Sequence, residues 1–362
     1  MIRKHIDDIS RRVAHRHCTL LLLLLTTVLA NACARGNGET ADGNASSSQV
    51  SAGGAVVGPQ SLTPVPLAAG ERLQVAATTS IIGDVVAQIG GDRIALFTII
   101  PPGVDPHSYT PTPQDLRALT AVDVIFVNGL HLEEGLQDLL GGADAPQVVV
   151  NTGVELLHGD DGHDSEADSA SSAAEEHDHG EDDPHTWQSV PNVRQWVQVI
   201  DEALGTLDPA NRAAYHEAAS NYDEALAALD RELRAQIDSL PQARRKLVTD
   251  HESFNYFAHT YGFTVIGAVI PSLSSLAESS AQELAALQDQ IAAEKVPAIF
   301  VSATANANLA DQLARDLNVA VVPLYSDALS IPSGPAATYL AFMRYNVQAI
   351  VTALQESSSS SQ

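Results

Sequence analysis

The sequence predicts an α/β fold of two lobes, each a mostly parallel sheet flanked by helices, joined by one long rigid helix. Short apolar runs alternate with amphipathic stretches over residues 72–190, and the same alternation resumes over residues 242–356. Such alternation is typical of parallel sheets with helices on their faces. Residues 191–241, between these regions, carry helical periodicity throughout and therefore predict the helices that connect the lobes.

Residues 1–33 predict a signal peptide for export from the cytoplasm. Basic residues precede an apolar run over 20–29 that is too short to cross a bilayer comfortably, and small residues follow it. Residues 30–33 (Ala-Asn-Ala-Cys) are similar to a bacterial lipobox, in which Cys33 would be lipidated and would anchor the chain to a membrane. Simple cleavage, which would leave a periplasmic protein without lipid, is the alternative.

The composition excludes several classes of binding partner and of site. Residues 34–71 are rich in Gly, Ser, Ala, Asn and Pro, and they predict a flexible tether. The formal net charge of −26 argues against nucleic acid, whose phosphates attract Lys and Arg, and against basic contacts with an anionic membrane surface. Since Cys18 would leave with the signal peptide, the mature chain offers neither a disulfide framework nor a cysteine zinc site.

In the first lobe, polar caps mark the helices between apolar strands. Thr79 or Ser80 can cap a helix that ends at a Gly-Gly pair, and Thr112 can cap one that begins at Pro113. The predicted strands are 73–78, 94–100, 122–127 and 147–150, and a further helix is predicted over 132–140.

Residues 155–183 interrupt the alternation with many Asp and Glu residues and no Lys or Arg, and they predict a disordered loop. The loop contains four histidines: His158, His163, His177 and His179. His-rich tracts often bind metals, so we interpret these residues as an accessory metal collector. A solvated acidic spacer with incidental histidines is the alternative.

The connecting region predicts a helix over 191–207 and a longer one that restarts at Asp208-Pro209 and runs to about residue 240. About 30 residues of helix span roughly 45 Å, long enough to bridge two lobes. Its apolar positions are spaced three and four apart: Tyr215, Ala219, Tyr222, Leu226, Leu229, Leu233 and Ile237.

In the second lobe, the predicted strands are 246–249, 263–270, 298–301 and 319–323. Helices are predicted over 253–261, 280–295, 308–317 and 338–354, and residues 357–362 predict a disordered tail.

Two similar turns point to a metal site. Residues 105–109 read Asp-Pro-His-Ser-Tyr and residues 183–187 read Asp-Pro-His-Thr-Trp. Proline stiffens each turn, so each would present one imidazole, the commonest metal-binding side chain. His251 and Asp327 follow strands of the second lobe. Taken singly, His251 is more simply a packed histidine and Asp327 a turn or cap residue.

Taken together, these residues predict a site in the cleft between the lobes. His107, His251 and Asp327 follow the carboxyl ends of strands, where open α/β sheets bind their ligands, and His185 follows the acidic loop. Three imidazoles and one carboxylate form a closed tetrahedral set suited to Zn²⁺.

These motifs resemble those of the bacterial ABC-transporter solute-binding proteins for metals, the zinc- and manganese-uptake lipoproteins. The resemblance covers about residues 72–356, and its further motifs are 128–133 (Asn-Gly-Leu-His-Leu-Glu), 251–257 and 325–329. It implies two lobes joined by one long helix, little hinge motion on loading, and delivery of the ion to a membrane permease powered by a cytoplasmic ATPase. It also implies a monomer without enzymatic activity.

The resemblance bears on the ion as well. The third ligand position carries His in zinc-type members and Glu in many manganese-type ones, and here it is His251. Nitrogen ligands favour zinc, whereas Asp327 keeps one hard ligand, so Mn²⁺ remains open. Glu278 stands where the family has Glu-Pro-Ser, as a second carboxylate near the site or an exposed loop acid.

Two other functions compete with metal uptake. A zinc hydrolase would use Glu252 as its base, but the chain lacks a His-Glu-x-x-His helix and Asp327 fills the position that catalysis needs open. A zinc-binding adhesin would use the acidic loop.

Overall fold

The computed structural model describes residues 55–158, 182–304 and 307–356. The signal peptide with Cys33, most of the acidic loop with His163, His177 and His179, and the tail lie outside the described residues. Among the helices that are described, none is long and apolar enough to cross a membrane.

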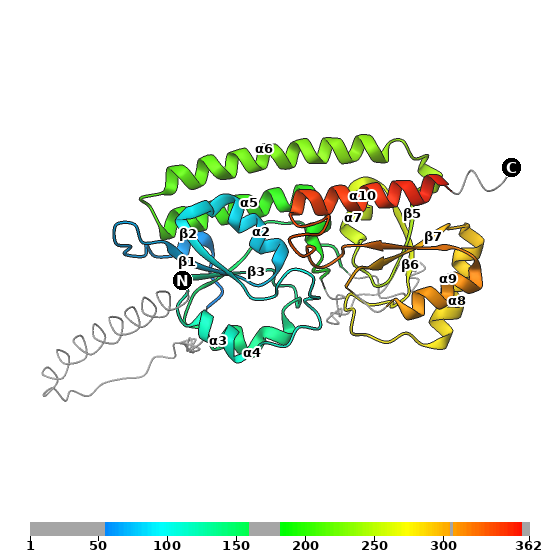
Figure 1. Cartoon of the computed structure of the whole chain (residues 1–362), viewed down its shortest axis with the longest axis horizontal. Helices are drawn as coiled ribbons and strands as arrows, with labels where there is room; N and C mark the ends of the chain where they lie inside the picture. The colour runs from blue at the N-terminus through cyan, green and yellow to red at the C-terminus, as the bar shows by residue number, and fades with distance from the viewer. Residues whose placement is uncertain (1–54, 159–181, 305–306, 357–362) are drawn as a thin grey trace, which may run out of the picture.

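The first lobe is a parallel sheet in the order β2-β1-β3-β4. Its strands are β1 (Leu73–Ala77), β2 (Ile94–Thr98), β3 (Val124–Val127) and β4 (Gln147–Val149). On one face α2 (Ser80–Gly90) packs in the main apolar cluster, and on the other lie α3 (Pro113–Leu119) and α4 (Gln137–Gly141) (Figure 1). Because both faces are covered, the strands read as almost continuous apolar runs.

The second lobe repeats this topology in the order β6-β5-β7-β8, again with parallel pairing. Its strands are β5 (Lys246–Thr249), β6 (Thr264–Ala268), β7 (Ala298–Ser302) and β8 (Ala320–Leu324). Its helices are α7 (Asn255–Tyr261), α8 (Ala281–Glu294), α9 (Asn308–Leu317) and α10 (Tyr339–Glu356). The predicted α/β fold with two parallel sheets is thus confirmed.

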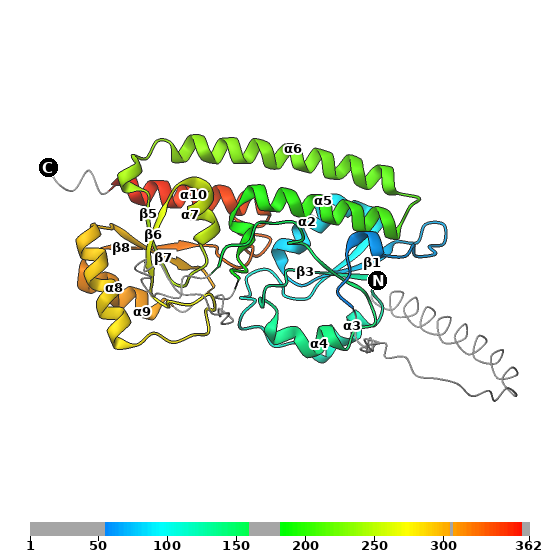
Figure 2. The same cartoon turned by 180° about the vertical axis from the view of Figure 1, so that it is seen from behind.

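Two helices connect the lobes: α5 (Val190–Leu207) and α6 (Arg212–Ile237). The 26 residues of α6 span roughly 39 Å. Figures 1 and 2 show α6 running along one side of both lobes, where it packs on α2 of the first and α10 of the second. The buried residues of α6 are the seven of the apolar stripe that the sequence predicts. One continuous apolar cluster therefore passes from lobe to lobe.

The structure differs from the predicted tether at residues 55–71. Val57 N–H donates to the Gln147 carbonyl at 2.9 Å, which adds an extended segment beside β4, and Val65 N–H donates to the Leu207 carbonyl at 2.8 Å. Leu62 is buried, and Val57 and Val65 pack against the main apolar cluster. These few apolar anchors lie among Pro and Gly residues, so the local composition conceals them.

The helix predicted over 132–140 is also shorter than expected. A 3-10 turn, η3 (Glu134–Leu136), precedes α4 at Gln137. The buried Glu133 carboxylate accepts hydrogen bonds from the Asn128 and Gly129 amides at 2.6 and 2.9 Å. Leu130 and His131 consequently turn through positive φ angles of 55° and 62°, which delays the helix.

Candidate metal centre

Each of the two Asp-Pro-His turns contains the same internal hydrogen bond. Asp105 Oδ1 accepts from the His107 amide at 2.9 Å, and Asp183 Oδ1 accepts from the His185 amide at 2.9 Å. An Asp that bonds the amide two residues later forms a compact turn, and the intervening proline fixes one backbone angle. The repeated sequence therefore forms the same turn twice, and each turn orients one imidazole.

The second lobe presents its two residues differently. His251 follows β5, and the preceding Asp250 accepts a hydrogen bond from the His251 amide at 2.9 Å. Asp327 follows β8, and the Ser326 hydroxyl donates to its Oδ2 atom. Both lie beyond the carboxyl ends of parallel strands, where open α/β sheets gather ligands.

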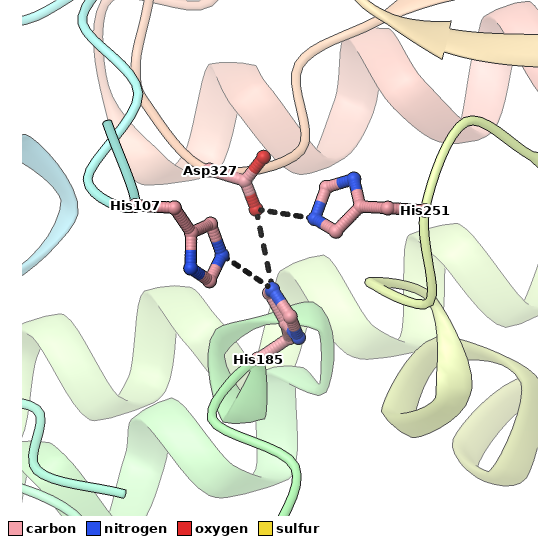
Figure 3. Close-up of side chains that lie close together, drawn as sticks. All are labelled: His107, His185, His251 and Asp327. Atoms are coloured by element: carbon pink, nitrogen blue, oxygen red, sulfur yellow. Dashed lines mark hydrogen bonds and ion pairs between the residues drawn. The ribbon is translucent and has the colours of Figure 1, made fainter. Parts of the chain in front are cut away.

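The structure brings together the four residues that the sequence singles out. One potential ligand atom from each of His107, His185, His251 and Asp327 lies within 4.8 Å of the other three (Figure 3). His107 Nε2 is 3.2 Å from His185 Nε2, and Asp327 Oδ1 is 3.6 Å from His185 Nε2 and 3.7 Å from His251 Nε2. A tetrahedral ion with bonds of about 2.0–2.1 Å would separate its ligand atoms by about 3.3 Å.

Burial supports this fit. The side chains of His185, His251 and Asp327 are 0%, 1% and 2% exposed. His251 Nε2 and Asp327 Oδ1 make no hydrogen bond with any described residue, and their only described polar neighbours lie in the cluster itself, at ion-pair distances of 3.6 and 3.7 Å. A buried polar atom without a hydrogen bond costs about 1–3 kcal/mol, which a bound cation would offset. The cluster is therefore a divalent metal site with three imidazoles and one carboxylate.

Two further carboxylates orient the imidazoles. Asp183 Oδ1 lies 2.7 Å from His185 Nδ1, and Asp250 Oδ1 lies 3.2 Å from His251 Nδ1. A carboxylate that accepts from Nδ1–H leaves the Nε2 lone pair for the metal and strengthens it as a ligand. These roles of Asp183 and Asp250 were not predicted from the sequence, although Asp183 stands two residues before His185 and Asp250 directly precedes His251.

The electrostatics of the cluster are uneven. Burial, reinforced by the nearby His185, lowers the pKa of His107 to about 3. Burial alone would also lower the pKa of His251, but Asp327 and Asp250 raise it well above its ordinary value. The pKa of Asp327 is lowered, because the attraction of His251 outweighs the effect of burial. His251 and Asp327 thus form a charged pair without metal, whereas His107 is neutral.

The remaining candidates lie outside the four-residue cluster. His158 pairs with Asp182 at 2.8 Å, at the point where the acidic loop leaves and rejoins the lobe. His131 is 63% exposed and lies 3.5 Å from Glu134, and Glu278 is exposed on the loop before α8.

The two lobes, the rigid connection and the buried cluster define a metal-binding solute-binding protein. The chain belongs to the family described as zinc-uptake complex component A, periplasmic, whose profile matches residues 75–353. It is therefore a component of ABC transport that acts outside the cytoplasm, and not an enzyme. The zinc hydrolase alternative is wrong.

Two similar proteins are named for manganese. The manganese-binding lipoprotein MntA of Halalkalibacterium halodurans is 32% identical over 289 residues, 79% of this chain and 90% of that protein. The manganese ABC transporter substrate-binding lipoprotein PsaA of Streptococcus anginosus is 27% identical over 93% of this chain and 98% of that protein.

Two solved structures are similar as well. The periplasmic zinc binding protein TroA from Treponema pallidum has a TM-score of 0.68 and 30% identity, over 78% of this chain and 99% of that one. The Mn-bound periplasmic metal binding protein from Candidatus Liberibacter asiaticus has a TM-score of 0.68 and 28% identity, over 78% of this chain and 100% of that one.

Proposed function

We propose that this protein captures Zn²⁺ or Mn²⁺ outside the cytoplasm through His107, His185, His251 and Asp327 and delivers the ion to an ABC-transporter permease. The observation that carries the proposal is the convergence of these four side chains, with two buried ligand atoms that lack other partners. The relatives named for manganese support this mixed interpretation, which the sequence left open beside its preference for zinc.

We further propose that the site binds Zn²⁺ more tightly than Mn²⁺. Three nitrogen donors suit zinc, and nitrogen and oxygen sites generally bind Zn²⁺ more strongly than Mn²⁺. The Ser326 hydroxyl engages Asp327 Oδ2, so the carboxylate offers one oxygen and favours four-coordination. Tighter zinc binding does not decide the cargo in the cell, because metal availability also selects the ion.

The test combines metal analysis with a ligand exchange. The protein purified from its native compartment is analysed for bound metals, and the metal-free form is titrated with Zn²⁺ and Mn²⁺ in competition. His251→Glu introduces a harder ligand, so the ratio of zinc to manganese affinity should fall relative to the unsubstituted protein. A protein that holds one equivalent of neither ion would contradict the proposal.

The proposed function also assigns roles to the N-terminal segment and to the acidic loop. We infer that Cys33 carries lipid and that residues 34–54 tether the folded body near its permease. We also infer that the four loop histidines act as an accessory collector of metal. Mass spectrometry of the mature N-terminus tests the lipid, and replacement of residues 159–181 by a short linker tests the loop.

A further inference from the structure

A short segment connects the ligand loops of the two lobes across the mouth of the metal site. We name residues 271–279, between β6 and α8, the strap. Residues 272–274 and Leu276 of the strap line a cavity of about 140 Å³, together with His107, Leu130 and His131 of the first lobe. The strap thus closes one side of the space next to the partly exposed imidazole of His107.

The base of the strap is tied to the loop that carries His251. The Glu252 amide donates to the Ser272 carbonyl at 3.0 Å, and Glu252 directly follows His251. The Ile270 amide, just before the strap, donates to the Asp250 carbonyl at 2.8 Å. The base of the strap is therefore anchored to the His251 side of the site.

The tip of the strap reaches the opposite lobe. The Ser275 hydroxyl donates to Asp105 Oδ2 at 2.6 Å, and the other oxygen of that carboxylate accepts from the His107 amide at 2.9 Å. A hydroxyl bonded to a carboxylate is among the stronger hydrogen bonds in proteins. One carboxylate consequently joins the strap of the second lobe to a metal ligand of the first.

Several other hydrogen bonds between the lobes involve the segment after Asp327. The Gly103 amide donates to the Leu329 carbonyl at 2.8 Å, the Leu329 amide donates to Ser80 Oγ at 3.1 Å, and the Tyr339 amide donates to Asp84 Oδ2 at 2.8 Å. Loss of the Ser275 bond would leave these contacts intact. The mouth could then open without separating the lobes.

We propose that Ser275 is a positioning residue that holds Asp105, and through it His107, in the metal-binding arrangement. The bond to Asp105 keeps the strap over the mouth, and its rupture opens the path by which the ion leaves. This inference rests on the proposed function and adds the element that controls release.

The variant that tests it is Ser275→Ala, with Ser274→Ala as its matched control. Ser274 is a neighbouring strap serine whose hydroxyl accepts from the Leu276 amide at 3.3 Å, within the strap. Ser275→Thr retains a hydroxyl and serves as the rescue. Release of Zn²⁺ from each loaded protein into excess chelator is followed by stopped flow, together with the rate of capture and the unfolding temperature of the metal-free form.

We expect Ser275→Ala to release Zn²⁺ about tenfold faster, the change that loss of one hydrogen bond to a charged group produces. Capture should not slow and the unfolding temperature should stay unchanged, and both Ser274→Ala and Ser275→Thr should release at close to the original rate. A rate for Ser275→Ala within twofold of the original, or an equal acceleration in Ser274→Ala, overturns the inference. Failure of the unsubstituted protein to bind Zn²⁺ or Mn²⁺ would instead overturn the proposed function.

Discussion

The two lobes share a strand order, yet they supply different kinds of ligand. The first lobe contributes His107 and His185 from Asp-Pro-His turns, whereas the second contributes a histidine and a carboxylate from strand ends. The ligand pKa values also differ: that of His107 is lowered, and that of His251 is raised by Asp327. The first lobe therefore offers a neutral imidazole at His107. In the second lobe, His251 must lose the proton that it shares with Asp327 before it can bind the metal.

The largest effect should come from removing the carboxylate of that charged pair. Asp327→Ala deletes the anionic ligand and leaves the buried His251 Nε2 without its carboxylate partner. We expect at least about a 100-fold loss of Zn²⁺ affinity, more than loss of an orienting partner produces. Competition titration with a chelator of known affinity measures it.

His131→Ala is the matched control, because His131 lines the mouth but is 63% exposed. Its affinity should stay within twofold of the original. Equal losses in Asp327→Ala and His131→Ala would show that the buried cluster does not hold the ion.

The orienting carboxylates sharpen the comparison between lobes. Asp183 lies 2.7 Å from His185 Nδ1 and also bonds the His185 amide, whereas Asp250 lies 3.2 Å from His251 Nδ1. Asp183→Asn and Asp250→Asn should each weaken Zn²⁺ binding about 10–100-fold, with the larger loss for Asp183→Asn. Calorimetric titration of both variants gives the order, and a larger loss for Asp250→Asn would reverse the assignment.

The difference in pKa predicts how binding responds to pH. Because the pKa of His251 is raised, this residue carries a proton that must leave when the metal binds. Apparent affinity should therefore fall as the pH drops, by about tenfold per unit while one proton is displaced. His107, whose pKa is lowered to about 3, adds nothing to this slope between pH 5 and 7.5.

Competition titrations across that range measure the slope, and the protons released on loading give an independent count. Affinity that is constant over the range would contradict the charged pair. The histidines of the two lobes would then not differ in protonation before the metal binds.

The same contrast explains how far the sequence could predict the site. The turns around His107 and His185 are visible because proline, aspartate and histidine recur in fixed order. The strand positions followed from apolar runs, and every residue of the α6 stripe followed from helical spacing. Asp250 and Ser275 escaped notice, because their roles depend on atoms brought together by folding. Ser275 meets Asp105 across 170 residues of sequence, and no local pattern encodes such a contact.

The smallest effect should come from the acidic loop. His158 and Asp182 form an antiparallel bridge, so the two ends of the loop lie side by side and a short Gly linker can replace residues 159–181. Because none of the four clustered ligands lies in that segment, the affinity of the first bound Zn²⁺ should change less than twofold. Additional weak equivalents should disappear if the loop collects metal. Equilibrium dialysis at rising Zn²⁺ separates the two classes. If the deletion abolished the tightly bound equivalent, the loop and not the buried cluster would hold the ion. The difference between the lobes would then have no bearing on metal binding.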